Sequence, residues 1–394
     1  MIYPANFEEK IGFDRIREQV TALCSTPSAK AKLAEEGFST SADEIERRLS
    51  LMNEMRSLLM LERDFPDGDY PDPAPLVAKI RVEGSYLLAA EADQLRKALV
   101  TVGAIAEFIL GRGGAHYPRL WELSRRVTLF PEIVRAIDAI LDDRGEVKDS
   151  ASPELQQVRR AIREREGQAA KRLQQVLQRA KQAGIVDADA VLSVRDGRPV
   201  IPVAAANKRK LQGFIHDESA TGRTFYVEPV EVVEINNELK ELEYAERREV
   251  VKVLSAFTES IRLDAEAIAD AGDYLSSVDM IRAKARWALA NDAGKPILST
   301  DDRLELRTAR HPLLQQTLRA QGREVVPLDL ALDRRKHILV ISGPNAGGKS
   351  VCLKTTGLMQ YLFQCGYPVP ASEVSELPVF RSIFIDIGDE QSID

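Results

Sequence analysis

The chain has 394 residues, of which 44% are hydrophobic and 29% are charged, and this length allows two or three domains with a core each. The net charge of −7 argues against a uniformly basic surface, so any site for nucleic acid has to be local. No apolar run approaches the roughly 18 residues that cross a bilayer, and the N-terminus lacks a basic segment followed by an apolar one. The three cysteines have no C-x-x-C spacing and indicate neither a disulfide framework nor a zinc site. A cytoplasmic protein without a membrane partner is expected.

Residues 1–150 are predicted to form a helical core. Ala42–Leu61 is a charged amphipathic segment, and another follows at Leu87–Ile109. Asp64–Pro75 contains four prolines, so it is predicted to be a loop. Gly111–Gly114 lacks the strand, the lysine and the serine or threonine of a nucleotide-binding loop, and we interpret it as a connector after a helix.

Two long helices are predicted within residues 151–295. Ser152 followed by Pro153 is typical of a helix start, and apolar residues then recur at three- and four-residue intervals until Gly184, as in a coiled coil. A second helical pattern runs from Pro229 to about Ala290 and would be about 90 Å long if unbroken. Together the patterns favour a long antiparallel coiled-coil arm, although a solvated coiled coil that only spaces domains would have the same sequence.

The segment between these helices, Val191–Glu228, is predicted to be a small β-rich tip. Its turn signals and prolines alternate with short apolar runs. Such a tip could bind the phosphates of a nucleic acid, because basic side chains concentrate in it and aromatic ones are interleaved. A solvated basic hairpin is the alternative. The candidate nucleic-acid-binding residues are Arg195, Arg198, Lys208, Arg209, Lys210 and Arg223.

Residues 296–394 are predicted to hold the first part of an α/β domain. A helix is predicted over Val351–Phe363, with strands on both sides of it in the sequence, as in an α/β sheet. The sequence stops before such a sheet would be complete. The predicted strands are Arg303–Leu306, Glu324–Leu332, Ile338–Ile341 and Ser382–Ile387.

The loop between Ile341 and Val351 matches the pattern G-x-x-x-x-G-K-[ST] of a phosphate-binding loop. Its glycines would allow tight turns that bring backbone N–H groups against phosphate oxygens. Lys349 would contact the β- and γ-phosphates of ATP, and the Ser350 hydroxyl would bind Mg²⁺. The alternative is a chance glycine-rich turn. The candidate ATP-binding residues are Gly343, Pro344, Asn345, Ala346, Gly347, Gly348, Lys349 and Ser350.

With these parts together, the sequence resembles the MutS family. Arg310–Leu314 (R-H-P-L-L), the loop Gly343–Ser350 and the two-helix arm with its β insertion carry the resemblance. Within the family the chain is similar to the second bacterial type, which lacks the mismatch-reading domain and ends in an Smr endonuclease domain. The segments that support this type are Val194–Pro202, His216–Gly222 and Asp386–Ser392.

The resemblance implies an ABC-type P-loop ATPase that uses ATP and Mg²⁺, forms a homodimer and closes as a clamp around nucleic acid. Branched DNA in the suppression of homologous recombination, and the rRNA of collided ribosomes, are the implied ligands. The sequence contains no Walker B strand, signature loop or Smr domain in the expected form, so we expect a truncated chain that is inactive by itself, and the catalytic residues remain unknown. Ile383–Glu390 is superficially similar to Walker B, but Asp386 interrupts its apolar run and Gly388 precedes the acids.

A P-loop also occurs in two other classes of protein, which fit this sequence less well than a clamp does. A structural ATPase of the SMC or Rad50 type would bridge DNA segments with its helices, but its arm runs to hundreds of residues and ends in a hinge. A metabolic P-loop kinase would leave about half of the chain unexplained as helix. The expected fold class is α plus α/β, with a helical core at 1–150, an arm at 151–295 whose clamp tip is 191–228, and an incomplete ATPase domain at 296–394.

Overall fold

The computed structural model describes residues 1–195, 197–344 and 348–386. Its contacts divide the chain into a first unit of residues 1–81, 94–134 and 263–394 and a second unit of residues 82–93 and 135–262. Both units combine helices with small sheets, which is an α plus β composition and agrees with the coarser part of the expected α plus α/β class. Each unit is discontinuous in sequence, and the three domain ranges expected above stay expectations.

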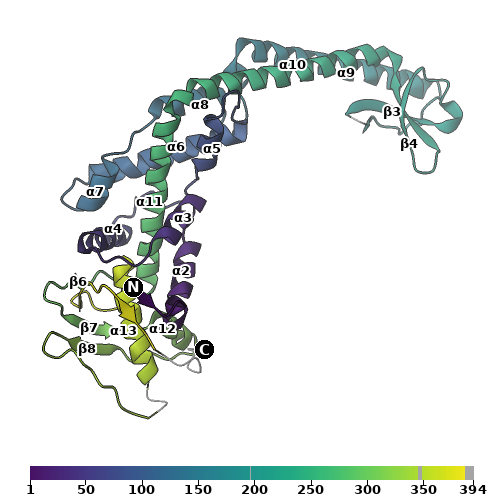
Figure 1. The fold of residues 1–394 in the computed structure, drawn as a ribbon. Coiled ribbons are helices and arrows are strands. Elements are labelled where there is room, and N and C mark those ends of the chain that lie inside the picture. The colour runs from purple at the N-terminus through teal and green to yellow at the C-terminus, as the bar shows by residue number, and fades with distance from the viewer. Residues whose placement is uncertain (196, 345–347, 387–394) are drawn as a thin grey trace. The chain divides into compact units, whose positions relative to one another are not determined.

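The first unit is mainly helical (Figure 1). Its helices are α1 (Phe7–Ile11), α2 (Phe13–Ala22), α3 (Pro27–Glu35), α4 (Ala42–Leu61), α5 (Ala74–Ile80), α7 (Pro118–Ser124), α11 (Ala265–Ala290), α12 (Pro312–Ala320) and α13 (Lys349–Gln364). Helices α6 (Ala89–Gly111) and α8 (Pro131–Ile140) each have residues in both units. Helix α11 packs against α3, α4 and α5, and aromatic side chains that include Phe7, Phe13 and Trp287 fill the core.

A small sheet in the first unit has the strand order β6-β9-β7-β8, and a two-stranded parallel sheet pairs β1 with β10. Because β1 is the N-terminal strand, residues 2–3 lie beside residues 383–384. The strands are β1 (Ile2–Tyr3), β6 (Ile297–Leu298), β7 (Leu304–Ala309), β8 (Leu328–Leu332), β9 (Glu376–Leu377) and β10 (Ile383–Phe384).

The second unit is an antiparallel helix pair with a four-stranded sheet at one end (Figure 1). Ion pairs join Arg159 to Glu246 at 2.7 Å and Arg165 to Glu238 at 2.8 Å, so residue numbers rise along α9 as they fall along α10. The elements are η1 (Asp149–Ala151), α9 (Pro153–Gln182), β2 (Ser193–Arg195), β3 (Arg198–Ala204), η2 (Ala205–Asn207), β4 (Gly213–Glu218), β5 (Thr224–Pro229) and α10 (Val230–Ser260).

Two predictions about helix limits are confirmed. Helix α4 covers Ala42–Leu61 as predicted. Helix α9 begins after Ser152, whose hydroxyl accepts a hydrogen bond from the Leu155 N–H at 3.0 Å, and Pro153 occupies its first position. None of the helices in the described ranges combines the length and the hydrophobicity of a membrane span.

The second long helix is not continuous, which corrects the prediction for Pro229–Ala290. It divides into α10 and α11, with the 3₁₀ turn η3 (Arg262–Asp264) between them. The Arg262 guanidinium donates to the Val82 and Ser85 carbonyls at 2.6 and 3.2 Å, and Leu263 is 97% exposed. Both helices bury an apolar face, so the apolar periodicity continues through the break and conceals it.

The predicted buried strand Ile338–Ile341 is also wrong. Residues 338–341 form neither helix nor strand, and Ile338 and Val340 are 76% and 83% exposed. A strand needs a neighbour for its backbone groups, and none of the described strands pairs with this segment.

Candidate functional site

The predicted phosphate-binding loop lies between residues 338–341 and α13, and its residues 345–347 lie outside the described ranges. Gly348 is the N-cap of α13 and has φ +82°, a left-handed conformation that glycine adopts without strain. The Lys349 ammonium donates to the Gly343 carbonyl at 2.6 Å, so this side chain reaches back across the loop. Ser350 lies in the first turn of the helix.

The described part of the loop fits a phosphate group. A Cβ placed on Gly343 or Gly348 would meet no atom of the described residues within 4 Å, so the described chain leaves space beside both glycines. The first N–H groups of a helix lack intrahelical acceptors and carry partial positive charge. At the start of α13 these groups would face the same ligand as Lys349 and Ser350.

Helix α13 is fixed to the first two helices of the chain through Tyr361. The Tyr361 hydroxyl donates to Glu8 at 2.6 Å, and Glu8 accepts two hydrogen bonds from Arg17, both at 2.7 Å. The Tyr361 ring packs edge-on against Phe13, with 4.9 Å between centroids. Burial raises the pKa of Tyr361, which keeps the phenol protonated as a donor. The predicted P-loop helix is therefore held on α1 and α2 at the end away from the loop.

The Arg310–Leu314 motif has a structural place in the first unit. His311 is the buried N-cap residue of α12, Pro312 occupies the first position of that helix and Leu313 belongs to the core. Burial, partly offset by the Ile11 backbone, lowers the pKa of His311 to about 4. The ring is therefore neutral at physiological pH, and the motif packs α12 against the N-terminal helices.

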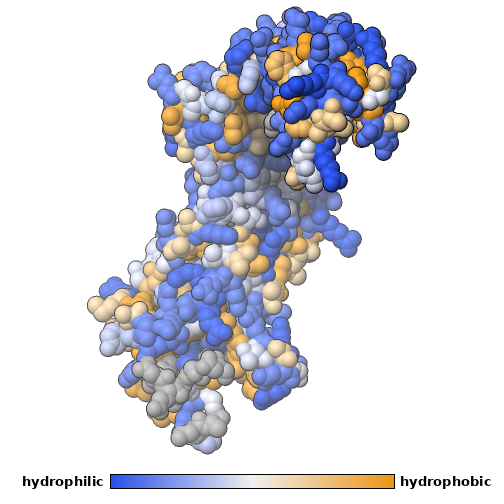
Figure 2. All heavy atoms as spheres, turned by 90° about the vertical axis from the view of Figure 1, so that its right-hand side faces the viewer, coloured by the Kyte–Doolittle hydropathy of each residue, from blue (hydrophilic) through white to orange (hydrophobic). Residues whose placement is uncertain are grey.

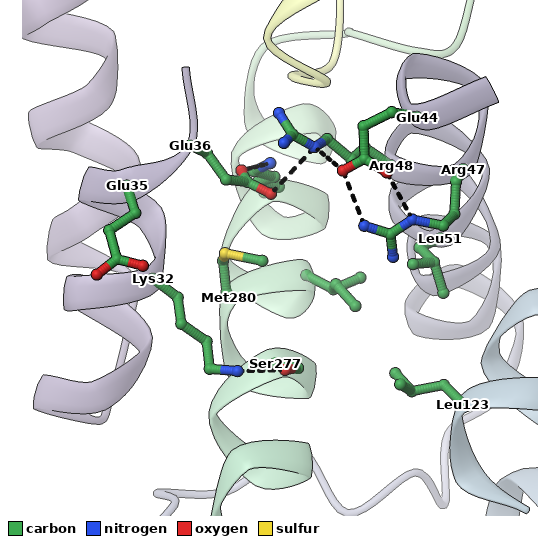
Figure 3. Close-up of a pocket in the computed structure, with 12 residues that line it drawn as sticks. Lys32, Glu35, Glu36, Glu44, Arg47, Arg48, Leu51, Leu123, Ser277 and Met280 are labelled. Atoms are coloured by element: carbon green, nitrogen blue, oxygen red, sulfur yellow. Dashed lines mark hydrogen bonds and ion pairs between the residues drawn. The ribbon is translucent and has the colours of Figure 1, made fainter. Parts of the chain in front are cut away.

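A charged pocket of about 370 Å³ in the first unit is a second concave feature (Figure 3). Arg47 and Arg48 both donate to Glu44, at 2.9 and 2.6 Å, and Lys32 donates to Ser277 at 2.9 Å. Lys32 also pairs with Asp273, and Lys284 with Glu36. Among the described residues, each basic side chain of the pocket is paired with an acid, so the pocket offers no unpaired cation to an anionic ligand.

The tip sheet has the order β2-β3-β5-β4, with every neighbouring pair antiparallel. One face of the sheet packs against α9, where Ile201, Val203 and Val227 join Leu173 and Val176 in a core. The face of the molecule that is drawn in Figure 2 is mainly hydrophilic, with small hydrophobic patches. The predicted β-rich tip is therefore present as a folded sheet.

Glu228, at the end of the tip next to α10, has a buried carboxylate that the sequence reasoning missed. It is 1% exposed and accepts hydrogen bonds from Arg198 at 2.9 Å, Asn236 at 2.6 Å and His216 at 2.6 Å. Burial alone would raise the pKa of Glu228, but the hydrogen bonds from Asn236, His216 and Arg198 lower it below its usual value. An acid among the apolar residues of Tyr226–Pro229 is the signal that could have indicated it.

The six predicted basic residues fall into two groups. Arg198 is paired with Glu228, and Arg195 pairs with Asp217 at 2.8 Å and stacks on Tyr226 at 3.9 Å. The other four, Lys208, Arg209, Lys210 and Arg223, are exposed.

Two contacts bring these four cations to one end of the sheet. The Ala205 N–H donates to the Arg223 carbonyl at 2.9 Å, which ties the loop after β3 to the start of β5. Lys208 also lies over the Phe225 ring at 4.6 Å. We call Lys208, Arg209, Lys210 and Arg223 the tip cluster.

The chain matches no family model, but it resembles bacterial proteins over nearly its whole length. It is 34% identical over 384 residues to endonuclease MutS2 of Bacillus velezensis, an alignment that covers 97% of this chain and 48% of that protein. It is 34% identical over 386 residues to endonuclease MutS2 of Pelotomaculum thermopropionicum, with 98% and 48% covered. For endonuclease MutS2 of Thermomicrobium roseum the identity is 35% over 395 residues, with 97% and 49% covered.

Similarity of this extent defines a shared family rather than a shared motif. That family is MutS2, and the chain belongs to it, which confirms the resemblance to the second bacterial type of MutS protein. The chain spans about half the length of the curated relatives it matches.

Proposed function

We propose that the chain is part of an ATP-dependent clamp that acts on nucleic acid. The observation that carries the proposal is the tip cluster, four exposed cations gathered at the end of a long helix pair. Lysine and arginine side chains in such a position suit a phosphate backbone, since they bind it without reading its sequence. The name of the relatives, endonuclease, supports a nucleic acid as the ligand.

The phosphate-binding loop would supply the energy input of this clamp. Gly343–Ser350 would hold the phosphates of ATP, and the Ser350 hydroxyl would bind the Mg²⁺ that accompanies them. When bound, the metal neutralises charge on the phosphates. Lys349 would leave the Gly343 carbonyl and contact the β- and γ-phosphates. The antiparallel pair of α9 and α10 would be the coiled-coil arm of the clamp, and the P-loop would belong to an ABC-type ATPase domain.

The whole protein would act as a cytoplasmic homodimer on branched DNA, on collided ribosomes or on both, and would cut nucleic acid through an Smr domain. Affinities of the full-length protein for a four-way DNA junction and for stalled disomes, at matched salt, would separate these ligands. A bridging ATPase of the SMC type is less consistent with the structure, since α9 has 30 residues and its chain returns through a β sheet.

The nucleotide site is tested by Lys349→Ala in the full-length protein, with Lys336→Ala, which removes an exposed cation 13 residues earlier in the sequence, as the control. Lys349→Ala should abolish productive ATP binding and hydrolysis without unfolding the protein, because it removes the charge that holds the phosphates. Undiminished ATPase activity in Lys349→Ala would refute the assignment. The 394-residue chain by itself should bind nucleotide weakly and show essentially no ATP hydrolysis.

The tip is tested by changing Lys208, Arg209 and Lys210 together to alanine. The matched control replaces Arg247, Arg248 and Lys252 of α10, three cations on a helix rich in acids. The tip variant should lose affinity for all sequences equally, and its slope of log K against log salt should fall by roughly 2 to 3 at about 0.7–0.9 per phosphate. A loss confined to certain sequences would point to base stacking instead.

A further inference from the structure

We propose that the outward face of α9 is a second phosphate-binding surface, which extends the tip cluster along the helix and binds a nucleic-acid duplex. This surface would hold the part of the duplex that lies beyond the tip cluster, and the proposal rests on the proposed nucleic-acid function. It concerns the second unit alone.

The two helices of the pair carry opposite charge. Helix α9 has eight basic and three acidic residues, a net charge of +5, whereas α10 has four basic and eight acidic residues, a net charge of −4. The asymmetry is greatest near the tip, where residues 167–182 contain four basic residues and no acid. Attraction between α9 and α10 does not explain the positive charge of residues 167–182, because the ion pairs between the two helices lie outside this segment.

The ion pairs of α9 lie in its other half. Arg159 and Arg163 both pair with Asp149, and Arg165 pairs with Glu238. By contrast, the four basic residues of the tip-proximal half form no ion pair with any described residue; they are Lys171, Arg172, Arg179 and Lys181. Their charge is therefore available to an external anion.

The geometry of α9 turns much of this charge outward. Leu173, Val176 and Ala180 are buried at helical spacing, whereas Lys171 and Arg179 are exposed. Five exposed glutamines share the outward surface, and amide N–H groups also bind phosphate oxygens; they are Gln168, Gln174, Gln175, Gln178 and Gln182. At 1.5 Å per residue, this half of the helix forms a straight row about 24 Å long. A duplex is stiff over such a distance, so its backbone can follow the row.

This row of cations adjoins the tip cluster. The Asn207 side chain donates to the Ile185 carbonyl at 3.0 Å, which fixes the loop that carries Lys208 to the chain just after α9. The Ala205 N–H of this loop donates to the Arg223 carbonyl, so Arg223 lies at the same end of the unit. The cations of α9 and the tip cluster are therefore neighbours. Phosphates bound at the tip would thus lead directly to α9.

An anionic membrane surface is the competing ligand for a basic helix. A membrane-binding helix needs large apolar side chains beside its cations, and among the described residues of α9 no large hydrophobic side chain is strongly exposed. The outward face has glutamines instead, which favours the nucleic acid.

The test uses full-length protein, a 30-bp DNA duplex and a single strand of the same length. Lys171 and Arg179 are changed together to alanine, and Arg247→Ala with Arg248→Ala on α10 is the matched control. We expect the slope of log K against log salt for the duplex to fall by roughly 1.8, at about 0.9 per phosphate. The control should leave the slope unchanged. Circular dichroism checks that the helices are intact.

The outcomes separate this inference from the proposed function. If the tip variant loses affinity and the α9 variant does not, the α9 surface is refuted and the nucleic-acid function stands. If the α9 variant alone loses affinity, the tip assignment fails while this inference survives. If neither variant changes duplex binding, the tip assignment and the α9 assignment are both wrong. If the α9 variant loses affinity only for anionic phosphatidylserine vesicles, α9 binds membranes instead.

Discussion

Removal of the buried Glu228 carboxylate should loosen the tip more than any single change on its surface. In Glu228→Ala, Arg198, His216 and Asn236 all lose their shared acceptor. Breaking a buried ion pair from one side costs about 3–5 kcal/mol, because the remaining charge is left uncompensated. The Arg198 side chain is 22% exposed and regains some hydration, so the lower end of this range applies.

Hydrogen exchange measured by mass spectrometry reports this loss locally. A cost of about 3 kcal/mol should reduce the protection of peptides from β3, β4 and β5 by roughly a hundredfold, at 1.4 kcal/mol per factor of ten. Peptides from α4, in the other unit, should be unchanged. Glu218→Ala removes an exposed carboxylate from β4 and is the control. Equal protection of the tip in the two variants would refute the view that Glu228 holds it together.

Three further changes test the packing around the site and the arm. As the pH falls from 7 to 5, His311 becomes protonated in the unfolded chain but stays neutral in the folded chain. The free energy of unfolding should therefore fall by about 2 kcal/mol. Denaturant titrations of His311→Gln should show a correspondingly smaller pH dependence, and an identical one would contradict the neutral ring. Tyr361→Phe removes the donor to Glu8 and should cost about 1–2 kcal/mol, seen as a lower melting temperature of the first unit. Ser152→Ala removes the cap on the Leu155 N–H and should cost about 1 kcal/mol, whereas no change would mean that water replaces the cap.

Local signals were enough to predict several elements. Ser152 and Pro153 mark the start of α9 because an N-cap hydroxyl and a proline act within one helical turn. The left-handed conformation of Gly348 likewise follows from the loop sequence, since glycine adopts positive φ readily. Features of this kind depend on neighbours in sequence, which a single sequence contains.

Features that depend on distant residues could not be predicted. Residues 338–341 are apolar like a buried strand, but a strand also requires a pairing partner, which the apolar pattern does not specify. Arg198 is indistinguishable from Lys208 in the sequence, and only the pairing of β3 with β5 brings the Glu228 carboxylate beside it as an ion-pair partner. The break at Arg262 depends on the carbonyl of Val82, 180 residues earlier.

The order of the segments along the chain has a consequence for synthesis. Helices α2 to α5 are synthesised before α11, the helix that packs against them, which follows roughly 200 residues later, or about 10–40 s at 5–20 residues per second. The second unit is contiguous from residue 135 to 262, so most of it can fold during that interval. The early helices meanwhile lack the partner that covers their apolar faces, and exposed apolar surface of this kind is prone to aggregation during synthesis.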